Sequence, residues 1–344
     1  MNKKMKILYI NNEPNSDHSK LHKYSRSFLP YYLSKKSNLL GIGKYELHKF
    51  YLKYLKFKPD IILSDWVPAG FIPVFLKKLG LIKCPIIHRW EDYYAETMTN
   101  YPYWLIKFME DYTAKNADHL IVIHKTIYRI APKINNSVFL LPYGVMLGNK
   151  KTKINLDKLK TKKSNLKVIY LGEINLPFKR VDKIIEAAKK NDCDLFLFGE
   201  EPNEKLKEMS KGYKTIHFMG WVDQDEVADV LRQGDILVNT ADLDMSMKFL
   251  EYVNAGKPIL ALDGKPSEFF KHKETAYLTQ DFEEGLRELI RNKNLRNRIS
   301  KGMKTIKLYS WEEVADLHLE LYKKIIFGGE DLDKFRESYY HVPL

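Results

Sequence analysis

The chain has little cysteine and no long apolar run. Only Cys84 and Cys193 occur among 344 residues, both in apolar, strand-like contexts. Two such thiols indicate a reducing compartment and buried free cysteines rather than a disulfide framework. No apolar run approaches the roughly 20 residues of a membrane-spanning helix. The basic N-terminus, MNKKMKILYINN, lacks the apolar core and cleavage site of a signal peptide. We therefore expect a cytoplasmic protein.

The sequence also lacks an arginine-rich run or a known nucleic-acid motif, although its net charge is +13. Its lysines are spread along the chain and are densest over residues 150–163. Such charge can attract nucleic acid, an anionic membrane surface or an anionic substrate such as a nucleotide-sugar. Without a motif we expect no nucleic acid and favour peripheral contact with the inner face of a membrane. A merely soluble basic surface explains the charge equally well.

Short apolar runs alternate with amphipathic stretches, which is typical of parallel sheets wrapped by helices. Strands are expected at residues 6–10, 60–63, 85–88, 119–123 and 138–141, and again at 167–171, 194–198, 215–218, 235–239 and 258–261. Helices are expected at residues 20–33, 45–56, 69–79, 103–115, 181–190, 203–210, 224–232, 247–255 and 283–292. The polar, lysine-rich stretch 149–165 separates the two halves. The predicted fold is α/β, with two Rossmann-like doubly wound domains facing across a cleft.

The stretch MKFLEYVNAGKPILA, residues 247–261, is the most informative part of the chain. It predicts a short helix that follows a strand-end loop and stops at the Gly-Lys-Pro sequence. Lys248 and Glu251 are three residues apart and therefore share one face of this helix. The helix start offers N–H groups to an anion, Lys248 adds a cation, and Glu251 can accept hydrogen bonds from hydroxyl groups. One turn could hold a diphosphate and a ribose, although an ordinary amphipathic helix with a surface ion pair explains the spacing equally well.

Six segments in series resemble the GT-B glycosyltransferases of family four, a group of retaining enzymes. They are YLGEINLPFKRVDKIIEAAK (170–189), FLFGEEP (196–202), IHFMGWV (216–222), QGDILVNT (233–240), the 247–261 stretch, which is similar to K-x-x-E-Y-x-x-x-G-K-P, and YSWEEVADLHLELYKKI (309–325). In the first half, EDYTAKNADHLIVIHKTI (110–127) and VFLLPYGV (138–145) resemble the last two strands before the family's linker. The family's glycine-rich loop after the first strand is missing, because that region reads NNEPNSDHSK.

This resemblance implies the domain organisation and the substrates. An N-terminal, acceptor-side domain would span residues 1–148, followed by a linker at 149–165. A nucleotide-sugar-binding domain would span 166–308, and a helix and tail at 309–344 would cross back onto the N-terminal domain. The donor would be a nucleotide-diphosphate sugar and the acceptor a saccharide or lipid-linked saccharide, in polysaccharide or glycoconjugate synthesis, with retention of configuration. No cofactor is expected.

The resemblance also implies which residues face the donor diphosphate. The departing diphosphate gains negative charge, so cations placed there act on the transition state. Lys179 and Lys248 would supply these charges, and Arg180 could assist. Without the resemblance, Lys179 and Arg180 would simply be a solvated cap before the helix 181–190.

Glu251 corresponds to the second of the family's two glutamates and would bind the ribose. The first falls on Leu243, which cannot replace it, although Asp242 and Asp244 flank that point and could contact the donor sugar. The other donor-side candidates are Gly172, Gly199, Glu200, Trp221, Val222 and Met247. A tryptophan at position 221 could pack near the base or simply support the fold.

In the first half, His88 ends a predicted apolar strand and begins HRWEDYY. Ligands collect at the carboxyl ends of strands in such sheets. His88 is therefore a catalytic candidate, with a hydrogen-bonded strand-end histidine as the alternative. Acceptor-side candidates from the same edge are Asp65, Trp66, Arg89 and Asp92.

The D-x-D pattern at residues 242–244 is a metal signature of a different glycosyltransferase fold, but it recurs at 192–194 and 331–333. Chance explains it, and the proposed lysines already supply positive charge, so no metal is expected. Three other functions remain open: a nucleotide-sugar epimerase of similar shape, a non-catalytic protein that binds nucleotides or nucleic acid, and a pseudoenzyme.

Overall fold

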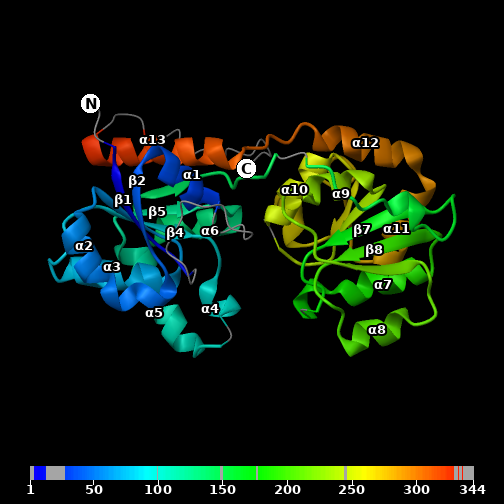
Figure 1. The fold of residues 1–344 in the computed structure, drawn as a ribbon, viewed down its shortest axis with the longest axis horizontal. Helices are drawn as coiled ribbons and strands as arrows, with labels where there is room; N and C mark the ends of the chain where they lie inside the picture. Colours follow the sequence, from blue (N-terminus) through cyan, green and yellow to red (C-terminus); the bar gives the residue numbers. More distant parts are fainter. Residues whose placement is uncertain are drawn as a thin grey trace. The chain divides into compact units, whose positions relative to one another are not determined.

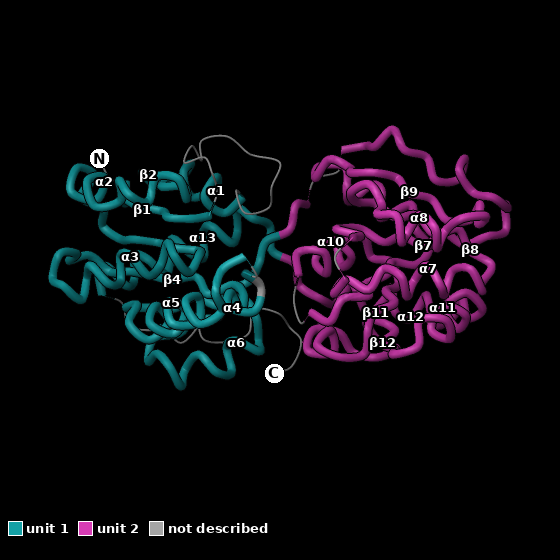
Figure 2. The backbone as a smooth tube through the Cα atoms, turned by 90° about the horizontal axis from the view of Figure 1, so that it is seen from below, with its two compact units in different colours: residues 1–144, 309–339 teal, residues 145–308, 340–344 magenta. Residues whose placement is uncertain are grey.

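The computed structural model (Figure 1) describes residues 4–12, 28–98, 100–147, 150–175, 177–243, 246–328, 332 and 335. The chain divides into two compact units. Unit 1 consists of residues 1–144 and 309–339, and unit 2 of residues 145–308 and 340–344 (Figure 2). The chain therefore enters unit 2 after Gly144 and returns to unit 1 at Tyr309.

Unit 1 is built on a parallel six-stranded sheet with the order β2-β1-β3-β4-β5-β6. Its strands are β1 (Lys6–Ile10), β2 (Asn38–Ile42), β3 (Ile61–Ser64), β4 (Ile86–Trp90), β5 (His119–Val122) and β6 (Val138–Leu140). Every residue of β3 and β4 is buried, as expected of central strands covered by helices on both faces.

Helices cover both faces of this sheet. They are α1 (Phe28–Lys36), α2 (Phe50–Phe57), α3 (Val67–Lys78), α4 (Tyr94–Thr97), α5 (Tyr103–Asn116), α6 (Lys125–Ile130) and α13 (Trp311–Phe327), with 3-10 turns η2 (Lys44–Lys49) and η3 (Ala131–Lys133). Helices α1 and α13 lie on one face, whereas α2, α3 and α5 lie on the other (Figure 1).

Helix α13 belongs to unit 1 although it comes from the far end of the chain. Ser310 and Glu313 form a capping box at its start. The Trp311 ring packs on Phe28 of α1, with the ring centres 5.7 Å apart. A Cβ atom on Gly144 would lie 2.4 Å from the Trp311 ring. Glycine is therefore required where the chain leaves unit 1, beside the helix with which it returns.

Unit 2 is built on a second parallel sheet with the order β12-β11-β10-β7-β8-β9. Its strands are β7 (Leu166–Leu171), β8 (Cys193–Phe198), β9 (Ile216–Gly220), β10 (Ile236–Asn239), β11 (Ile259–Leu262) and β12 (Tyr277–Thr279). Successive strands run to one side of β7 as far as β9 and then continue on its other side from β10. The carboxyl edge between β7 and β10 is therefore a topological switch point, where such sheets bind ligands.

The helices of unit 2 again cover both faces, with α7 and α8 on one and α9 and α10 on the other (Figure 1). They are α7 (Val181–Lys189), α8 (Glu204–Ser210), α9 (Val227–Gln233), α10 (Met247–Ala255), α11 (Phe282–Arg291) and α12 (Lys293–Met303), with 3-10 turns η4 (Leu156–Lys158), η5 (Pro177–Lys179) and η6 (Lys265–Glu268).

The lysine-rich stretch before β7 belongs to unit 2 and packs on it. Leu156 is fully buried, and its N–H donates to Gln233 Oε1 at 3.0 Å. Both the N–H and the hydroxyl of Thr161 donate to Asp194, at 3.0 and 2.9 Å. Residues 150–165 are therefore attached to unit 2 by buried apolar and hydrogen-bonded contacts, in spite of their polar composition.

The predicted α/β fold class, including the final helix that returns to the first unit, is confirmed. All ten predicted strands are present, but β2 and β12 were not predicted. Both are edge strands; β2 reads NLLGI directly after a helix, and β12 has three residues, so neither gave a clear pattern. The helix predicted at 20–33 corresponds to α1 at Phe28–Lys36, and residues 20–27 lie outside the described residues.

Cys84 and Cys193 are free thiols, one in each unit. Burial raises the pKa of Cys84 to about 11 and that of Cys193 to about 12. Neither is therefore a reactive thiolate at neutral pH. Within the described segments, no helix combines the length and the apolar character needed to cross a membrane.

Candidate functional site

The carboxyl edge of the unit 2 sheet brings two glycines together. Gly172 follows β7 with φ +126°, and its N–H donates to the carbonyl of Phe198 at 2.9 Å. Gly199 follows β8 and donates to the carbonyl of Gly220 at 3.1 Å. A Cβ atom on Gly199 would lie 2.3 Å from the carbonyl oxygen of Gly172. Gly172 is thus required by its backbone conformation and Gly199 by the close approach of the two loops.

The Lys248 side chain extends from the first turn of α10 to this edge. Its Nζ lies 4.2 Å from the centre of the Tyr170 ring, and a Cβ atom on Gly172 would be 3.2 Å from it. This nitrogen is buried and has no hydrogen-bond partner among the described residues. Burial, together with the charge of Lys179, lowers the pKa of Lys248 to about 7. A buried amine without a partner costs free energy, and this is the kind of group that an anionic ligand would stabilise.

Lys179 belongs to the same cluster, since its charge acts directly on the pKa of Lys248. It ends η5, and its carbonyl accepts a hydrogen bond from the hydroxyl of Thr240, just beyond β10. This bond holds the loop after β7 against the end of β10. Arg180 follows with φ +51° and stands at the N-cap of α7. The two predicted lysines are therefore gathered at the switch point of the sheet.

Glu251 lies one turn after Lys248 on α10 and is 6% exposed. The side-chain amide of Gln224 donates a hydrogen bond to its carboxylate. Burial raises the pKa of Glu251 to about 7, while the bond from Gln224 and the charge of Lys248 act in the opposite direction. One helical turn therefore presents a cation and a hydrogen-bond acceptor, as the spacing of these residues predicts.

Glu200 holds a neighbouring loop in place through hydrogen bonds to its side chain. Its Oε1 accepts hydrogen bonds from the backbone N–H groups of Ile174 and Asn175, each at 2.9 Å. Asn175 in turn donates to the carbonyl of Glu201 and accepts from the N–H of Asn203, each at 2.8 Å. The second oxygen, Oε2, is buried without a partner among the described residues. Glu200 therefore holds in place the loop that leads to η5.

Three other donor-side candidates lie beyond strand ends or at the helix start. Trp221 and Val222 directly follow β9, and Trp221 is 66% exposed. Met247 is the first residue of α10 and is partly buried. It follows the N-cap Ser246, whose hydroxyl accepts a hydrogen bond from the first turn of the helix. The large exposed face of Trp221 leaves it available to a ligand.

Asp242 is exposed, and its carboxylate accepts a hydrogen bond from the N–H of Lys265 at 2.7 Å. A Cβ atom on Gly264 would lie 2.5 Å from Asp242 Oδ1. The carboxylate therefore holds the loop after β11. Asp244 lies outside the described residues.

His88 lies inside β4 rather than at its end, because the strand continues to Trp90. Its ring is buried, with Nδ1 3.0 Å from the Ser64 hydroxyl. A Cβ atom on Gly70 of α3 would lie 2.7 Å from the same nitrogen. Burial lowers the pKa of His88 to about 3. The prediction that His88 ends its strand is wrong, and the ring packs as a neutral group between the sheet and α3.

Arg89 and Asp65 form a buried ion pair, with Arg89 Nη1 2.7 Å from Asp65 Oδ2. Arg89 also pairs with Glu91. Tyr9 donates its hydroxyl to the Asp65 carboxylate, and Tyr94 donates to the Asp65 carbonyl at 2.7 Å. Burial raises the pKa of Asp65 to about 7, although the charge of Arg89 acts against this shift. The pair therefore joins the ends of β1, β3 and β4 from inside unit 1.

Trp66 and Asp92 are the remaining unit 1 candidates, and Glu91 lies beside Asp92 in the chain. Trp66 is 8% exposed and packs in the hydrophobic core at the start of α3. Asp92 accepts a hydrogen bond from the N–H of Tyr93 at 2.9 Å. Glu91, which the sequence interpretation missed, is the first residue beyond β4, and Arg89 fixes its carboxylate. If the sequence interpretation had ended β4 at Trp90 rather than at His88, Glu91 would have been the first residue beyond the strand and therefore a candidate.

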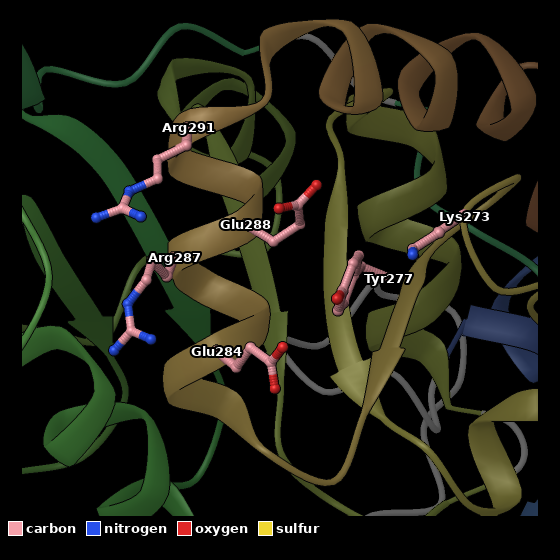
Figure 3. Close-up of a pocket in the computed structure, with 6 residues that line it drawn as sticks. All are labelled: Lys273, Tyr277, Glu284, Arg287, Glu288 and Arg291. Atoms are coloured by element: carbon pink, nitrogen blue, oxygen red, sulfur yellow. The ribbon is translucent and has the colours of Figure 1, made fainter.

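The described residues contain no group of three or more His, Cys, Asp or Glu side chains that could hold a metal ion. An open pocket does lie between β12 and α11, lined by Lys273, Tyr277, Glu284, Arg287, Glu288 and Arg291. Figure 3 shows the two glutamates pointing toward Tyr277 and the two arginines pointing away from it. Because these charges diverge, and Arg287 already pairs with Glu283, the pocket is a charged helix surface rather than a converging site.

Comparison with known proteins supports the resemblance seen in the sequence. The family model described as glycosyl transferases group 1 matches residues 165–292. The matched part runs from β7 to the end of α11 and contains every donor-side residue named above. The search of curated proteins found no significant match.

Solved structures show the same fold over nearly the whole chain. HepE from Anabaena, solved with UDP-glucose, is 14% identical with a TM-score of 0.70, covering 92% of this chain and 98% of its own. Sucrose-phosphate synthase from Thermosynechococcus elongatus is 16% identical with a TM-score of 0.71, covering 94% and 89%. A putative UDP-N-acetylglucosamine 2-epimerase from Listeria monocytogenes is 15% identical with a TM-score of 0.60, covering 95% and 98%. The fold is therefore GT-B, as predicted.

Proposed function

We propose that this protein is a glycosyltransferase that moves a sugar from a nucleotide-diphosphate donor to a saccharide or lipid-linked acceptor. The proposal depends mainly on Lys248, whose nitrogen is buried without a hydrogen-bond partner among the described residues, beside Gly172 and Lys179. A bound diphosphate would provide the countercharge that this amine lacks. The match of residues 165–292 to the glycosyl transferases group 1 and the UDP-glucose bound by HepE support this donor class.

Each residue of the cluster has a role in this reaction. As the bond between sugar and diphosphate breaks, negative charge builds up on the leaving group, and Lys248 and Lys179 stabilise it. Glu251 accepts hydrogen bonds from the ribose hydroxyl groups. Gly172 and Gly199 carry no side chains, so the donor can approach the main chain closely at these two positions. Because two lysines supply the charge, the proposed reaction uses no metal ion or other cofactor.

Retention of configuration is part of the proposal and is supported by the resemblance to family four. No carboxylate near Lys248 is assigned as a nucleophile, so no covalent intermediate is proposed. A lipid-linked acceptor, in the synthesis of a polysaccharide or glycoconjugate, would bring the enzyme to the inner face of a membrane.

A nucleotide-sugar epimerase is the second candidate, because the putative 2-epimerase from Listeria monocytogenes shares the fold. An epimerase would change the donor sugar without needing an acceptor. The family match favours the transferase. Products can be separated by NMR: a transferase releases nucleoside diphosphate in proportion to acceptor, whereas an epimerase yields an isomer of the nucleotide-sugar.

The donor site is tested by thermal denaturation with UDP, GDP, ADP and their sugars, since a ligand that binds the folded state raises the melting temperature. The test variants are Lys248→Met and Glu251→Gln, and the control is Lys183→Ala, an exposed lysine on α7. We expect one nucleotide to stabilise the native protein and the control but neither test variant. Lys248→Met should also raise the melting temperature of the empty protein, because it removes a buried amine that costs stability.

Two results would argue against the proposal. Equal stabilisation of Lys248→Met and the native protein by the nucleotide would remove Lys248 from the site. Stabilisation by no nucleotide or nucleotide-sugar in the panel would reject the donor class.

A further inference from the structure

One outer face of unit 1 exposes many large apolar side chains. Of seventeen exposed large apolar residues in the described part of the chain, ten come from η2, α2, α3, α5 and the residues next to them. They are Tyr45, Leu52, Leu55, Phe75, Leu79, Leu81, Tyr101, Tyr103, Trp104 and Phe108. Leu52 is 62% exposed and Trp104 is 70% exposed. We call this surface the α2–α3–α5 face.

The elements of this face are connected to one another. Helices α2, α3 and α5 lie on the same side of the sheet, opposite α1 and α13 (Figure 1). The Phe71 ring on α3 lies 5.9 Å from Phe75 and 6.0 Å from Phe108 of α5, measured between ring centres. On the other flank, the N–H of Lys83 donates to the hydroxyl of Tyr54 on α2 at 3.1 Å. The apolar residues therefore belong to one surface rather than to three isolated spots.

Lysines accompany these apolar groups. Segments 44–58 and 67–83 contain eight lysines and a single acidic residue, Glu46, which pairs with Lys53. The exposed leucines of α2 alternate with these lysines in the sequence FYLKYLKF. Exposed Trp, Tyr and Leu side chains among lysines are the composition of surfaces that lie at the boundary between lipid headgroups and acyl chains.

We propose that the α2–α3–α5 face binds the surface of an anionic lipid bilayer. The lysines would be attracted to the anionic headgroups, and Trp104 and Leu52 would insert between them. Charge argues against a second copy of this chain as the occupant, because two such lysine-rich faces would repel each other. Nucleic acid could use the lysines and aromatic rings of this face, but it would leave the exposed leucines, among them Leu52 and Leu79, without an apolar partner.

This proposal goes beyond the proposed chemistry and does not depend on it. The face is formed entirely by unit 1 and contains none of the residues of the Lys248 cluster, which belongs to unit 2. Failure of nucleotide binding would therefore leave the membrane proposal standing, and the reverse also holds.

The charge component is tested by sedimentation with vesicles of phosphatidylcholine alone and vesicles rich in phosphatidylglycerol. The test variant is Lys49→Gln/Lys56→Gln/Lys83→Gln, in which all three lysines are exposed. Because each lysine near an anionic surface contributes about 1 kcal/mol, or about fivefold, the partition coefficient should fall about a hundredfold. The matched control, Lys163→Gln/Lys214→Gln/Lys293→Gln, makes the same charge change on exposed positions of unit 2 and should retain binding.

The apolar component is tested with Leu52→Asn/Trp104→Asn. Phe327→Asn is its control, because Phe327 is 78% exposed at the end of α13, outside the face. We expect the double variant to lose binding to phosphatidylglycerol vesicles and the control to keep it. Since all of these positions are exposed, melting temperatures and the nucleotide-induced shift should remain those of the native protein, which separates loss of docking from unfolding.

Three results would overturn the proposal. Native protein that does not sediment with phosphatidylglycerol vesicles has no such surface. Equal loss of binding in test and control variants would mean that general charge, not this face, is responsible. A native dimer that Leu52→Asn/Trp104→Asn dissociates, as measured by analytical ultracentrifugation, would assign the face to a second copy of the chain.

Discussion

Raising the pH above neutrality should weaken nucleotide binding, because Lys248 must be charged to hold a diphosphate. In the empty protein, burial and the neighbouring Lys179 lower its pKa from 10.5 to about 7. A bound diphosphate would raise this pKa again by supplying an opposite charge. Between the two pKa values, each binding event takes up a proton, so the affinity must fall as the pH rises.

The size of the effect follows from the pKa of the empty site. Lys248 is about half protonated at pH 7 and about one part in a hundred protonated at pH 9, so the dissociation constant should rise about fiftyfold, or about 2 kcal/mol. Glu251, whose burial raises its pKa to about 7, ionises over the same range. Its fuller ionisation can improve hydrogen-bond acceptance by about twofold at most. The net loss of affinity is therefore about 25-fold to 50-fold.

Isothermal titration calorimetry with the nucleotide found by thermal denaturation measures both quantities. Repeating the titration in buffers with different heats of ionisation gives the number of protons taken up. Lys248→Met should bind weakly and without this pH dependence. In Lys179→Met, the pKa of Lys248 should rise, because a neighbouring positive charge has been removed, and proton uptake should begin at higher pH. An affinity that is constant from pH 7 to 9 with no proton uptake would refute the reasoning.

Three further substitutions test the framework of the two units. Tyr252→Phe removes a hydroxyl that donates to β10 at 3.0 Å and accepts from the end of β7 at 3.1 Å; it should lower the free energy of unfolding by about 1–3 kcal/mol in urea titrations. Gly199→Ala places a Cβ atom 2.3 Å from the carbonyl oxygen of Gly172 and should reduce both the melting temperature and nucleotide binding. Arg89→Met leaves the buried Asp65 without its partner and should cost about 3–5 kcal/mol while Asp65 is ionised. Because Arg89 holds the pKa of Asp65 down, the variant should raise that pKa above its native value, and the loss should shrink as the pH falls and Asp65 becomes protonated. Unchanged melting curves would contradict each assignment.

The sequence predicted best those features that depend on local geometry. Lys248 and Glu251 share a helix face because they are three residues apart, and this spacing could be read without any tertiary information. The burial of the Lys248 nitrogen was not predictable in this way, since it depends on Tyr170 and Gly172, more than a full βαβ unit away in the chain. Glu200 was predicted to face the donor, but two backbone N–H groups of a neighbouring loop occupy one of its oxygens.

The error at β4 shows the same distinction. The apolar run ends at His88 in the sequence, because Arg89 looks like the start of an exposed loop. In the structure Arg89 is buried and the strand continues, since Asp65 at the end of β3 and Glu91 neutralise its charge. A charged residue can thus extend a buried strand when its partner comes from another strand, and a single sequence does not reveal that pairing.

The net charge of +13 therefore includes lysines in different environments, buried and exposed, which the composition alone does not distinguish. The Lys248 nitrogen is buried and the pKa of this lysine is about 7, so in the empty protein it contributes only about half a charge at neutral pH. Its charge becomes complete only when an anion binds, and burial shields that interaction from salt. The exposed lysines of the α2–α3–α5 face interact with other charges through water, so salt screens them strongly. One group is suited to a specific anion in a protein site, and the other to a surface that carries many anions at once.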